Sequence, residues 1–461
     1  MSAQSSSEGL LRTLGVVGAA AFVVTNMVGS GIFTLPALVR VTTGGAIASM
    51  AVWAAAGLLG ICGALCYAEL ATRMPDAGGE YRYLERAFGP LWGFLSGWTS
   101  YVVGFSAAVA ASALGFTAYL EPLIPAWNAQ ALISEGVSVT QGSVFAAVVV
   151  LGLTAVHSIG VHSSGRFQSS LAIAVVCAVW ILVIVGFVSG NGSWSGLSVR
   201  AAAQGSWWAA LLPVSYAYAG WNAAAYMGGE VRDPGRSLPR AIIGGCGFVM
   251  LLYLAVNTLF FYAIPEAEWE PTIAVGHLAA ERLFGQGGSI VISGIIALAM
   301  FGSVSAMTAV GPRIYYAMAR DGLAPRPMAR LSKQGRVPVT SIVAQGMLAS
   351  LLALTGALEA LLIYIGSSLL LFNALTIATL FVFRRRDGTP APFMAPLFPL
   401  PAVIFLGITL AAWGSGLMAT PAPTLAALAT LLGGACIYAT GNALGWFERQ
   451  RDAIQQTVDE G

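Results

Sequence analysis

Charged residues are scarce in this sequence. Of its 461 residues only 9% are charged and 57% are hydrophobic, whereas a water-soluble domain carries about 25% charged residues. A chain with so few charges cannot cover a water-facing surface, so the composition excludes a soluble globular fold and predicts an all-α integral membrane protein. The net charge of +2 is too small to indicate a nucleic-acid partner.

Cysteine and histidine are also rare, and their positions exclude two classes of site. The three histidines lie at the edges of predicted loops, and no HExxH or GxSxG motif is present, so neither a membrane-embedded enzyme nor a metal or other cofactor is expected. No two cysteines form a CxxC pair, and we expect all five to be small core residues: Cys62, Cys66, Cys177, Cys246 and Cys436.

Acidic residues are missing from the predicted membrane interior. Glu69 and Glu230 stand at the ends of predicted helices, and no Asp or Glu lies near a predicted midplane. Ionisable residues at that depth mark proton or cation paths. Their absence argues against a carboxylate-based relay and against a channel with a charged ring.

Long apolar segments dominate what is present. A membrane-spanning helix needs about 20 apolar residues, and the sequence contains twelve such segments with polar connections that hold nearly every charge. The predicted helices cover residues 14–39, 45–69, 91–120, 142–159, 166–189, 207–230, 241–264, 288–312, 339–356, 359–382, 396–418 and 422–446.

The distribution of basic residues predicts the orientation of these helices. With twelve spans, all but three of the 22 basic residues fall on one side, the exceptions being Arg40, Arg200 and Arg282. Basic loops are cytoplasmic, so both the tail 1–13 and the tail 447–461 are expected in the cytoplasm of a multi-pass plasma (inner) membrane protein. Lys333 is the one lysine beside 21 arginines, and Ala and Gly are abundant, which indicates a GC-rich bacterial gene.

Two of the predicted helices are interrupted by polar and small residues. "NMVGSGIF" at 26–33 interrupts the first, and "SYAYAGWN" at 215–222 interrupts the sixth. These helices open two blocks of five, 14–189 and 207–382, followed by 396–446. Interrupted helices at corresponding positions in two such blocks indicate a transporter site between inverted repeats.

Broken helices would give this site a specific chemistry. If Gly29, Ser30 and Gly31 unwind, a new helix begins near Ile32, and its first amide N–H groups can hold a carboxylate. If 216–220 unwinds, helix-end carbonyl groups can accept hydrogen bonds from a protonated amine. An α-amino acid carries both groups. Close helix packing through small residues is the alternative explanation of the GSG segment.

Four segments resemble one transporter family. "GSGIF" at 29–33 is similar to the first-helix motif of the amino acid–polyamine–organocation superfamily, and "CYAELATRMPDAGGEYRYLERAFGP" at 66–90 is similar to its connection between helices 2 and 3. "YAYAGWN" at 216–222 with "GEVRDPGRSLPRAI" at 229–242 resembles its helix 6 region, and "GPRIYYAMARDGLAP" at 311–325 its helix 8 exit. The resemblance is closest to the L-type and cationic amino acid transporter branches.

This resemblance implies a LeuT-type fold of ten core helices plus two, with helices 1 and 6 broken, and alternating access. It implies that Gly29, Ser30, Gly31 and the adjoining Ile32 hold the substrate carboxylate. The amine would contact the carbonyl groups of Val28, Tyr216, Ala217 and Ala219.

Three further side chains have two interpretations each. Tyr216 and Trp221 correspond to gating positions, or are core or interfacial aromatic residues. Asn222 contacts the substrate or caps the second half of helix 6. We expect Tyr216, Trp221 and Asn222 to bind the substrate, and Tyr216 and Trp221 also to gate the site.

Ion coupling is not indicated by the family pattern. Several members carry a lysine nine residues after the arginine that corresponds to Arg166, and here that position is Val175. His157 and His162 could titrate near neutral pH, or are polar residues at a helix mouth. The sequence therefore predicts exchange or facilitated transport of a neutral α-amino acid within the lipid bilayer, with no accessory subunit. The alternative is a cationic amino acid or a polyamine or other organic cation, with proton coupling.

Overall fold

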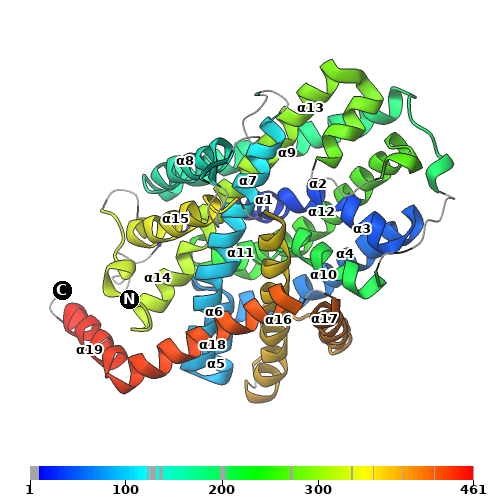
Figure 1. The fold of residues 1–461 in the computed structure, drawn as a ribbon. Helices are drawn as coiled ribbons and strands as arrows, with labels where there is room; N and C mark the ends of the chain where they lie inside the picture. The colour runs from blue at the N-terminus through cyan, green and yellow to red at the C-terminus, as the bar shows by residue number, and fades with distance from the viewer. Residues whose placement is uncertain are drawn as a thin grey trace.

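Helices account for nearly all of the described structure. The computed structural model describes residues 10–459 except 122–123, 125–130, 134–138, 198–202, 204, 270–273, 334–335, 357, 388 and 420. Most of the predicted tail 1–13 and the basic residue Arg200 therefore lie outside the described residues. Figure 1 shows α1 and α2 in the middle of the helical assembly, with both termini marked at the left edge of the view.

The elements of the first half include one long helix that changes type along its length. In chain order they are α1 (Val16–Met27), α2 (Ser30–Thr34), α3 (Pro36–Thr43), α4 (Ala46–Arg73), α5 (Glu80–Phe88), α6 (Pro90–Thr99), η1 (Ser100–Ala107), α7 (Ala108–Leu120), β1 (Ala131–Ile133), β2 (Val139–Thr140), α8 (Gln141–His157), α9 (Val161–Val188) and η2 (Ser195–Leu197). The two strands pair antiparallel.

The second half repeats the pattern of a short divided helix followed by longer ones. Its elements are α10 (Trp207–Ala217), α11 (Ala223–Tyr226), η3 (Gly228–Glu230), α12 (Pro234–Ala263), η4 (Glu266–Glu268), α13 (Val275–Val310), α14 (Pro312–Arg320), η5 (Arg326–Ala329), α15 (Val339–Ala353), α16 (Leu358–Arg386), α17 (Leu400–Ala419), α18 (Pro421–Ala443) and α19 (Trp446–Asp459). Proline starts many of these helices, as in α12 and α14, because its fixed φ and missing N–H suit the first turn.

All twelve predicted segments fall on one, two or three consecutive helical elements. Within the described residues, nine helices are long and apolar enough to cross a membrane, and α1 and α2 together count as one of these. The apolar helices α8 and α15 are shorter. The segment 207–230 is divided between α10, α11 and η3. The exact number of membrane crossings remains a prediction.

The predicted helix 91–120 contains a π-helical segment. The α-helix α6 changes into η1 at Ser100 and returns to an α-helix at Ala108. A π-helix adds a residue to each turn and occurs often at functional sites. Hydropathy could not indicate it, because η1 is as apolar as its neighbours.

The C-terminal tail forms a helix that the sequence analysis did not predict. At the start of α19, Phe447 is buried, and its ring stacks on Tyr438 of α18 at 5.1 Å and meets Phe94 of α6 edge to face at 5.7 Å. The aromatic contacts hold α19 against two predicted spanning helices.

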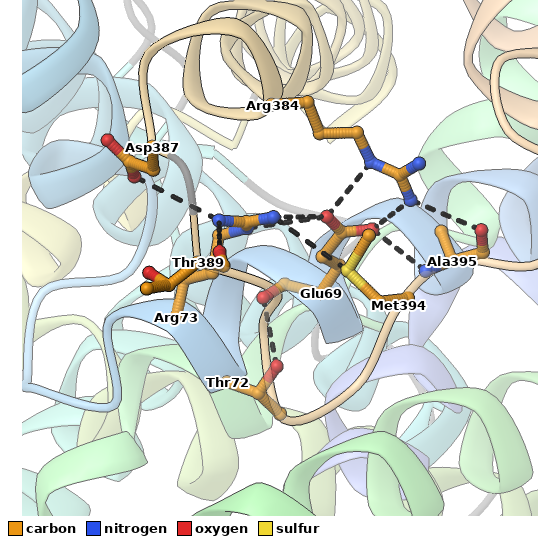
Figure 2. Close-up of polar contacts among 8 residues, drawn as sticks. All are labelled: Glu69, Thr72, Arg73, Arg384, Asp387, Thr389, Met394 and Ala395. Carbon is orange, nitrogen blue, oxygen red and sulfur yellow. Dashed lines mark hydrogen bonds and ion pairs between the residues drawn. The ribbon is translucent and has the colours of Figure 1, made fainter.

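A buried carboxylate joins three segments at the end of α4. Glu69 has no exposed surface. Arg73 donates to it at 3.0 Å, Arg384 of α16 at 2.5 Å and 3.0 Å, and the backbone N–H of Ala395 at 2.8 Å (Figure 2). The acid predicted only as a helix end therefore fixes α16 and the segment before α17 onto α4.

We expect Glu69→Gln to destabilise the protein, because the amide leaves two arginines without their shared counter-charge. Removing one partner of a buried ion pair costs about 3–5 kcal/mol, and the lower end applies here because Arg384 is 22% exposed. Thermal unfolding in detergent measures the effect. Glu268→Gln, in the exposed pair with Arg282, is the matched control and should shift the midpoint little. Equal shifts for both variants would contradict the assignment.

Candidate functional site

The first predicted interruption is present as a gap between α1 and α2. The backbone leaves the helical conformation at Val28, with ψ of 82°, and at Gly29, with φ of −134° and ψ of −148°. The new helix begins at Ser30, two residues earlier than the sequence analysis placed it. Leu35 keeps helical angles between α2 and α3, so the chain beyond the gap runs on as a helix to Thr43.

The second interruption lies slightly later than predicted. The helix α10 ends at Ala217, and α11 begins at Ala223. We expected residues 216–220 to unwind, whereas the structure unwinds 218–222 and leaves Tyr216 in the helix. Gly220 has a φ of 109°, a left-handed conformation that side chains with a Cβ rarely adopt.

The two interruptions are in direct contact. A Cβ on Gly31 would lie 2.6 Å from the Cα of Ala217, and a Cβ on Gly220 would lie 2.8 Å from the Nδ2 of Asn26. Glycine at these positions is therefore needed for the approach of α2 to α10 and of the second gap to α1. These contacts confirm the packing explanation of the GSG segment, and the binding explanation stays a prediction.

Tyr253 on α12 links the last carbonyl groups of the two broken helices. Its hydroxyl donates to the carbonyl oxygen of Met27, and it lies 2.9 Å from the carbonyl oxygen of Ala217. A helix leaves its last four carbonyl groups without intrahelical partners; the Met27 carbonyl oxygen also accepts from the Gly29 N–H at 2.9 Å, whereas Tyr253 is the donor to Ala217 among the described residues. One buried hydroxyl therefore serves the ends of both α1 and α10.

A small cavity of about 40 Å³ lies between the interruptions. Among the described residues that line it, none is charged. Five of its polar side chains come from α1, η1, α13, α11 and α16, and its walls also include both glycine-containing gaps. The lining residues are Asn26, Met27, Gly29, Ser30, Gly31, Ser100, Gly104, Phe105, Ala108, Tyr216, Ala217, Ala219, Gly220, Asn222, Tyr226, Ser303, Met307, Leu369 and Asn373.

Seven of the ten predicted binding residues line this cavity: Gly29, Ser30, Gly31, Tyr216, Ala217, Ala219 and Asn222. The hydroxyl groups of Ser30 and Tyr216 lie 3.0 Å apart. This contact joins the predicted carboxylate segment directly to the predicted gate.

The other three predicted residues lie outside the lining. Val28 and Ile32 are buried beside it. Trp221 packs edge to face on Tyr67 of α4, with ring centroids 4.6 Å apart, and also meets Phe405 of α17. Its gating role remains a prediction, and its contacts in this structure are those of a core residue.

Asn222 does not cap α11. It precedes that helix, but its side chain makes no capping hydrogen bond. The Nδ2 group donates instead to Glu80 at 2.7 Å and to the Tyr226 hydroxyl at 3.0 Å. The capping interpretation is therefore wrong, and the side chain faces both the cavity and a buried carboxyl group.

Sequence reasoning missed several of the residues that line the cavity. Asn26 lines the cavity, and its Oδ1 is a buried acceptor without a hydrogen-bond partner among the described residues. Ser303 lies so close to Gly29 that a Cβ there would approach its Oγ to 2.6 Å. Asn26 could have been found, because it is the one amide in the apolar run before the GSG segment. Ser303 carries no such signal, since serine is common in α13.

His157, one of the two histidines considered for titration, belongs to a chain of buried, hydrogen-bonded polar side chains. His157 contacts the Ser305 hydroxyl at 2.9 Å, Ser305 donates to the Gln168 Oε1 at 2.8 Å, and Gln168 donates to the Thr25 hydroxyl at 2.5 Å. This chain joins α8, α13, α9 and α1. The side chain of His162 lies outside the described part of the structure.

Comparison with known proteins finds a matching family model and several similar transporters. The family model described as "Amino acid permease" matches residues 14–438. The large neutral amino acids transporter small subunit 2 of Mus musculus is 30% identical over 455 residues, which cover 95% of this chain and 83% of that protein. The serine/threonine exchanger SteT of Bacillus subtilis (strain 168) is 27% identical over 422 residues, covering 90% of this chain and 93% of SteT.

A further relative and a solved structure agree with these matches. The b(0,+)-type amino acid transporter 1 of Mus musculus is 28% identical over 415 residues, covering 88% of this chain and 82% of that protein. The crystal structure of MhsT in complex with L-phenylalanine has a TM-score of 0.61 at 15% identity, and covers 92% of this chain and 100% of MhsT. This likeness supports the LeuT-type fold implied by the sequence resemblance.

We expect Gly31→Leu to abolish transport while the protein still folds, because the added side chain must enter the contact with Ala217. Uptake into proteoliposomes measures transport, and size-exclusion elution with thermal unfolding checks the fold. Gly247→Leu on α12 is the matched control, since a Cβ at Gly247 meets no atom within 4 Å. Normal transport by Gly31→Leu would contradict the proposed geometry.

We expect Tyr253→Phe to weaken both stability and transport, because it removes the hydroxyl that serves Met27 and Ala217. The Met27 carbonyl oxygen keeps the Gly29 N–H, but the Ala217 carbonyl oxygen loses its donor, and a buried acceptor left without a donor costs about 1–3 kcal/mol. Thermal unfolding and initial exchange rates measure the two effects. The control is Tyr262→Phe on the same helix, whose ring packs on Phe187 and Trp194. Unchanged transport in Tyr253→Phe would show that the two helix ends need no shared donor.

Proposed function

We propose, because the chain belongs to the amino acid permease family, that this membrane transporter moves a small neutral α-amino acid by exchange or facilitated transport. Family membership agrees with the sequence-based exclusion of an enzyme. The observation that carries the proposal is the contact between two helix interruptions around an uncharged cavity.

The carboxylate of the substrate would bind at Gly29, Ser30 and Gly31. The first amide groups of a helix have no intrahelical acceptor, and the positive end of the helix dipole favours an anion there. Because α2 continues into α3 through Leu35, this dipole extends over more than one short helix. The Ser30 hydroxyl adds a donor from the same segment.

The ammonium group would bind on the opposite side of the cavity. The unpartnered Oδ1 of Asn26 is one acceptor, and the carbonyl groups of Val28, Tyr216, Ala217 and Ala219 are the predicted others. A buried acceptor without a partner carries a desolvation cost that a bound donor removes. The empty hydrogen-bonding capacity of Asn26 therefore favours a protonated amine.

The lining favours a neutral and small side chain. A cationic substrate would need a carboxylate or an aromatic face, and no charged residue is among the described lining residues. The cavity of about 40 Å³ exceeds the roughly 10–15 Å³ that one water needs, but it leaves little room beyond the amino acid backbone. SteT is named as a serine/threonine exchanger, and serine and threonine have small neutral side chains.

A cationic amino acid or a polyamine remains the second candidate. Phe105 and Tyr226 line the cavity and pack edge to face at 5.5 Å, so an aromatic surface for a cation is present. The relatives include a protein named as a b(0,+)-type amino acid transporter as well as one named for large neutral amino acids, so they do not all belong to one branch of the family. Competition by arginine and by putrescine distinguishes this candidate from the first.

Alternating access would move the interrupted helices against the rest. We propose twelve membrane spans with both termini in the cytoplasm of the plasma (inner) membrane, two inverted repeats at 14–189 and 207–382, and two further helices at 396–446. Tyr216 would close the cavity on the outer side, since α10 leads inward from the predicted outer surface. Asn222 and Tyr226 would lie on the cytoplasmic side.

The expectation of no accessory subunit is not supported by the relatives, because the mouse relative is itself named a small subunit. SteT of Bacillus subtilis is a bacterial relative of nearly matching coverage. A bacterial origin of this chain remains our proposal.

Purified protein in liposomes tests the proposed function. Liposomes loaded with unlabelled L-serine should take up external radiolabelled L-serine faster than empty liposomes. In an exchanger the binding site returns to the outside with internal serine bound, so internal serine is needed for each cycle. The remaining amino acids, arginine and putrescine serve as competitors, and Gly31→Leu is the inactive control. No uptake of any of the twenty amino acids, in loaded or in empty liposomes, would overturn the proposal.

A further inference from the structure

A carboxyl group without a counter-charge lies beside the cavity. Glu80, the first residue of α5, is 2% exposed. Among the described residues it forms no ion pair with an arginine, lysine or histidine. An isolated buried carboxylate is costly, so a group of this kind tends to take up a proton instead. Sequence reasoning gave Glu80 no role, because it follows the second predicted helix in a polar connection.

A turn of two glycines carries Glu80 into the protein. Gly78 and Gly79 have φ angles of 114° and 47°. A Cβ on Gly79 would lie 2.5 Å from the ring of Tyr226, and one on Gly78 would lie 2.8 Å from Ala317. The segment "AGGE" therefore reverses the chain where no other residue fits, and it sets Glu80 against the α11 side of the cavity.

Three hydrogen-bond partners connect Glu80 with the cavity lining. Asn222 donates to its Oε1 at 2.7 Å, and the Tyr226 hydroxyl also bonds to the carboxyl group. Tyr67 of α4 lies 2.7 Å from the same Oε1 and 3.0 Å from the Oδ1 of Asn373. Asn222, Tyr226 and Asn373 all line the cavity, so Glu80 is one side chain removed from a bound substrate.

The count of hydrogens around Tyr67 fits a protonated Glu80. A phenol has one hydrogen, so Tyr67 cannot donate fully to both Glu80 and Asn373. If Glu80 carries a proton, it can donate to the Tyr67 oxygen, and the Tyr67 hydrogen is then free for the Asn373 Oδ1. If Glu80 is ionised, one of the two short contacts lacks a hydrogen.

The charged groups packed around this cluster are already paired. On α5 itself and on the adjoining α14 and α16, five arginines are paired with carboxylates: Arg82 with Asp321, Arg86 with Asp76, Arg313 with Glu230, Arg384 with Glu69 and Arg386 with Asp387. Glu69 and Asp387 are each shared with Arg73 of α4. The remaining titratable neighbours are phenols, Tyr67, Tyr83 and Tyr226.

The helix N-terminus and the burial of the side chain act on the proton affinity of Glu80 in opposite directions. The N-terminus of α5 favours an anion at Glu80. Burial acts the other way and is the larger effect, so the pKa of Glu80 is raised above its ordinary value even though Tyr67, Tyr226 and Asn222 donate to the carboxyl group and lower it.

We propose that Glu80 binds a proton while the cavity is closed on the α11 side and releases it when that side opens to water. The inference rests on the proposed function, because opening and closing are steps of the transport cycle. Opening hydrates the carboxyl group and separates it from Asn222 and Tyr226. High pH therefore favours the open state on this side, and low pH favours the closed state.

The pH dependence of exchange in proteoliposomes tests this proposal. Radiolabelled L-serine exchange is measured with the same pH on both sides, from about pH 5 to about pH 8.5, which lies above the usual glutamate pKa near 4.3. The wild-type rate should change through one titration step, and Glu80→Gln should lack that step. Glu85→Gln, on the same helix and with its carboxyl group outside the cluster, should keep it.

A second variant keeps the test decisive if Glu80→Gln does not fold. Tyr67→Phe removes a hydrogen-bond partner of the carboxyl group, so the step should move to a different pH. A step that stays in place in Tyr67→Phe, or one that persists in Glu80→Gln, would overturn the proposal.

A measurement without substrate separates this inference from the proposed function. The reporter is Ser100→Cys, a cavity residue of η1, in a protein whose five native cysteines are replaced. A membrane-impermeant maleimide is applied from the cytoplasmic side. The labelling rate should rise more steeply with pH when Glu80 is present than in Glu80→Gln. The Glu80→Gln variant corrects for ionisation of the thiol, which also raises the labelling rate. Equal acceleration in both would refute the proton-linked gate even if amino acids are transported.

Discussion

The structure depends on how it satisfies backbone polar groups where two helices stop inside an apolar interior. In such surroundings each unpaired amide or carbonyl group costs several kcal/mol. The ends of α1 and α10 therefore need partners from elsewhere, and the one hydroxyl hydrogen of Tyr253 is shared between the carbonyl oxygens of Met27 and Ala217. Because one hydroxyl serves both ends, the two interruptions must lie at the same depth and within one side chain of each other.

Small residues make this proximity possible. The backbone of Gly31 reaches Ala217, and Gly220 reaches Asn26, at distances that no Cβ would allow. Glycine in a helix interior costs about 1 kcal/mol relative to alanine, and the close contact of the two gaps explains why the sequence accepts that cost. The polar groups left over, such as the Asn26 Oδ1, then face a cavity rather than lipid.

The sequence predicted the parts of this arrangement that have local signatures. Apolar length predicted where the helices lie, and the "GSG" and "YAYAGWN" segments predicted the two gaps. The exact gap in the second helix was misplaced by two residues, because Gly220 sets it through a φ of 109° and Tyr216 still belongs to α10. The π-helix η1, Ser303 and Tyr253 follow from packing between distant helices, and hydropathy treats them as ordinary apolar or small residues. Trp221 corresponds to a gating position in the family, but its contacts are those of a core residue.

Glu80 shows why a search for acids inside predicted spans was incomplete. That search examined the position of each acid along the chain, and Glu80 stands between two spans. Its burial is decided by the turn at Gly78 and Gly79, which returns α5 toward the cavity. An amphipathic segment next to a membrane helix can therefore place an ionisable side chain in the protein interior even though no predicted span contains such a side chain.

The hydrogen bonds of Glu80 also limit how strongly a proton can influence the gate. Coupling between two bound species is reciprocal, so the proton favours closure by as much as closure favours the proton. Each unit of difference in the pKa of Glu80 between the closed and open states is worth about 1.4 kcal/mol. Asn222 and Tyr226 touch both the carboxyl group and the cavity, so a substrate that draws their donors away from Glu80 raises its pKa. Substrate and proton then favour the same closed state, and a substrate too small to reach Asn222 would leave the proton affinity unchanged.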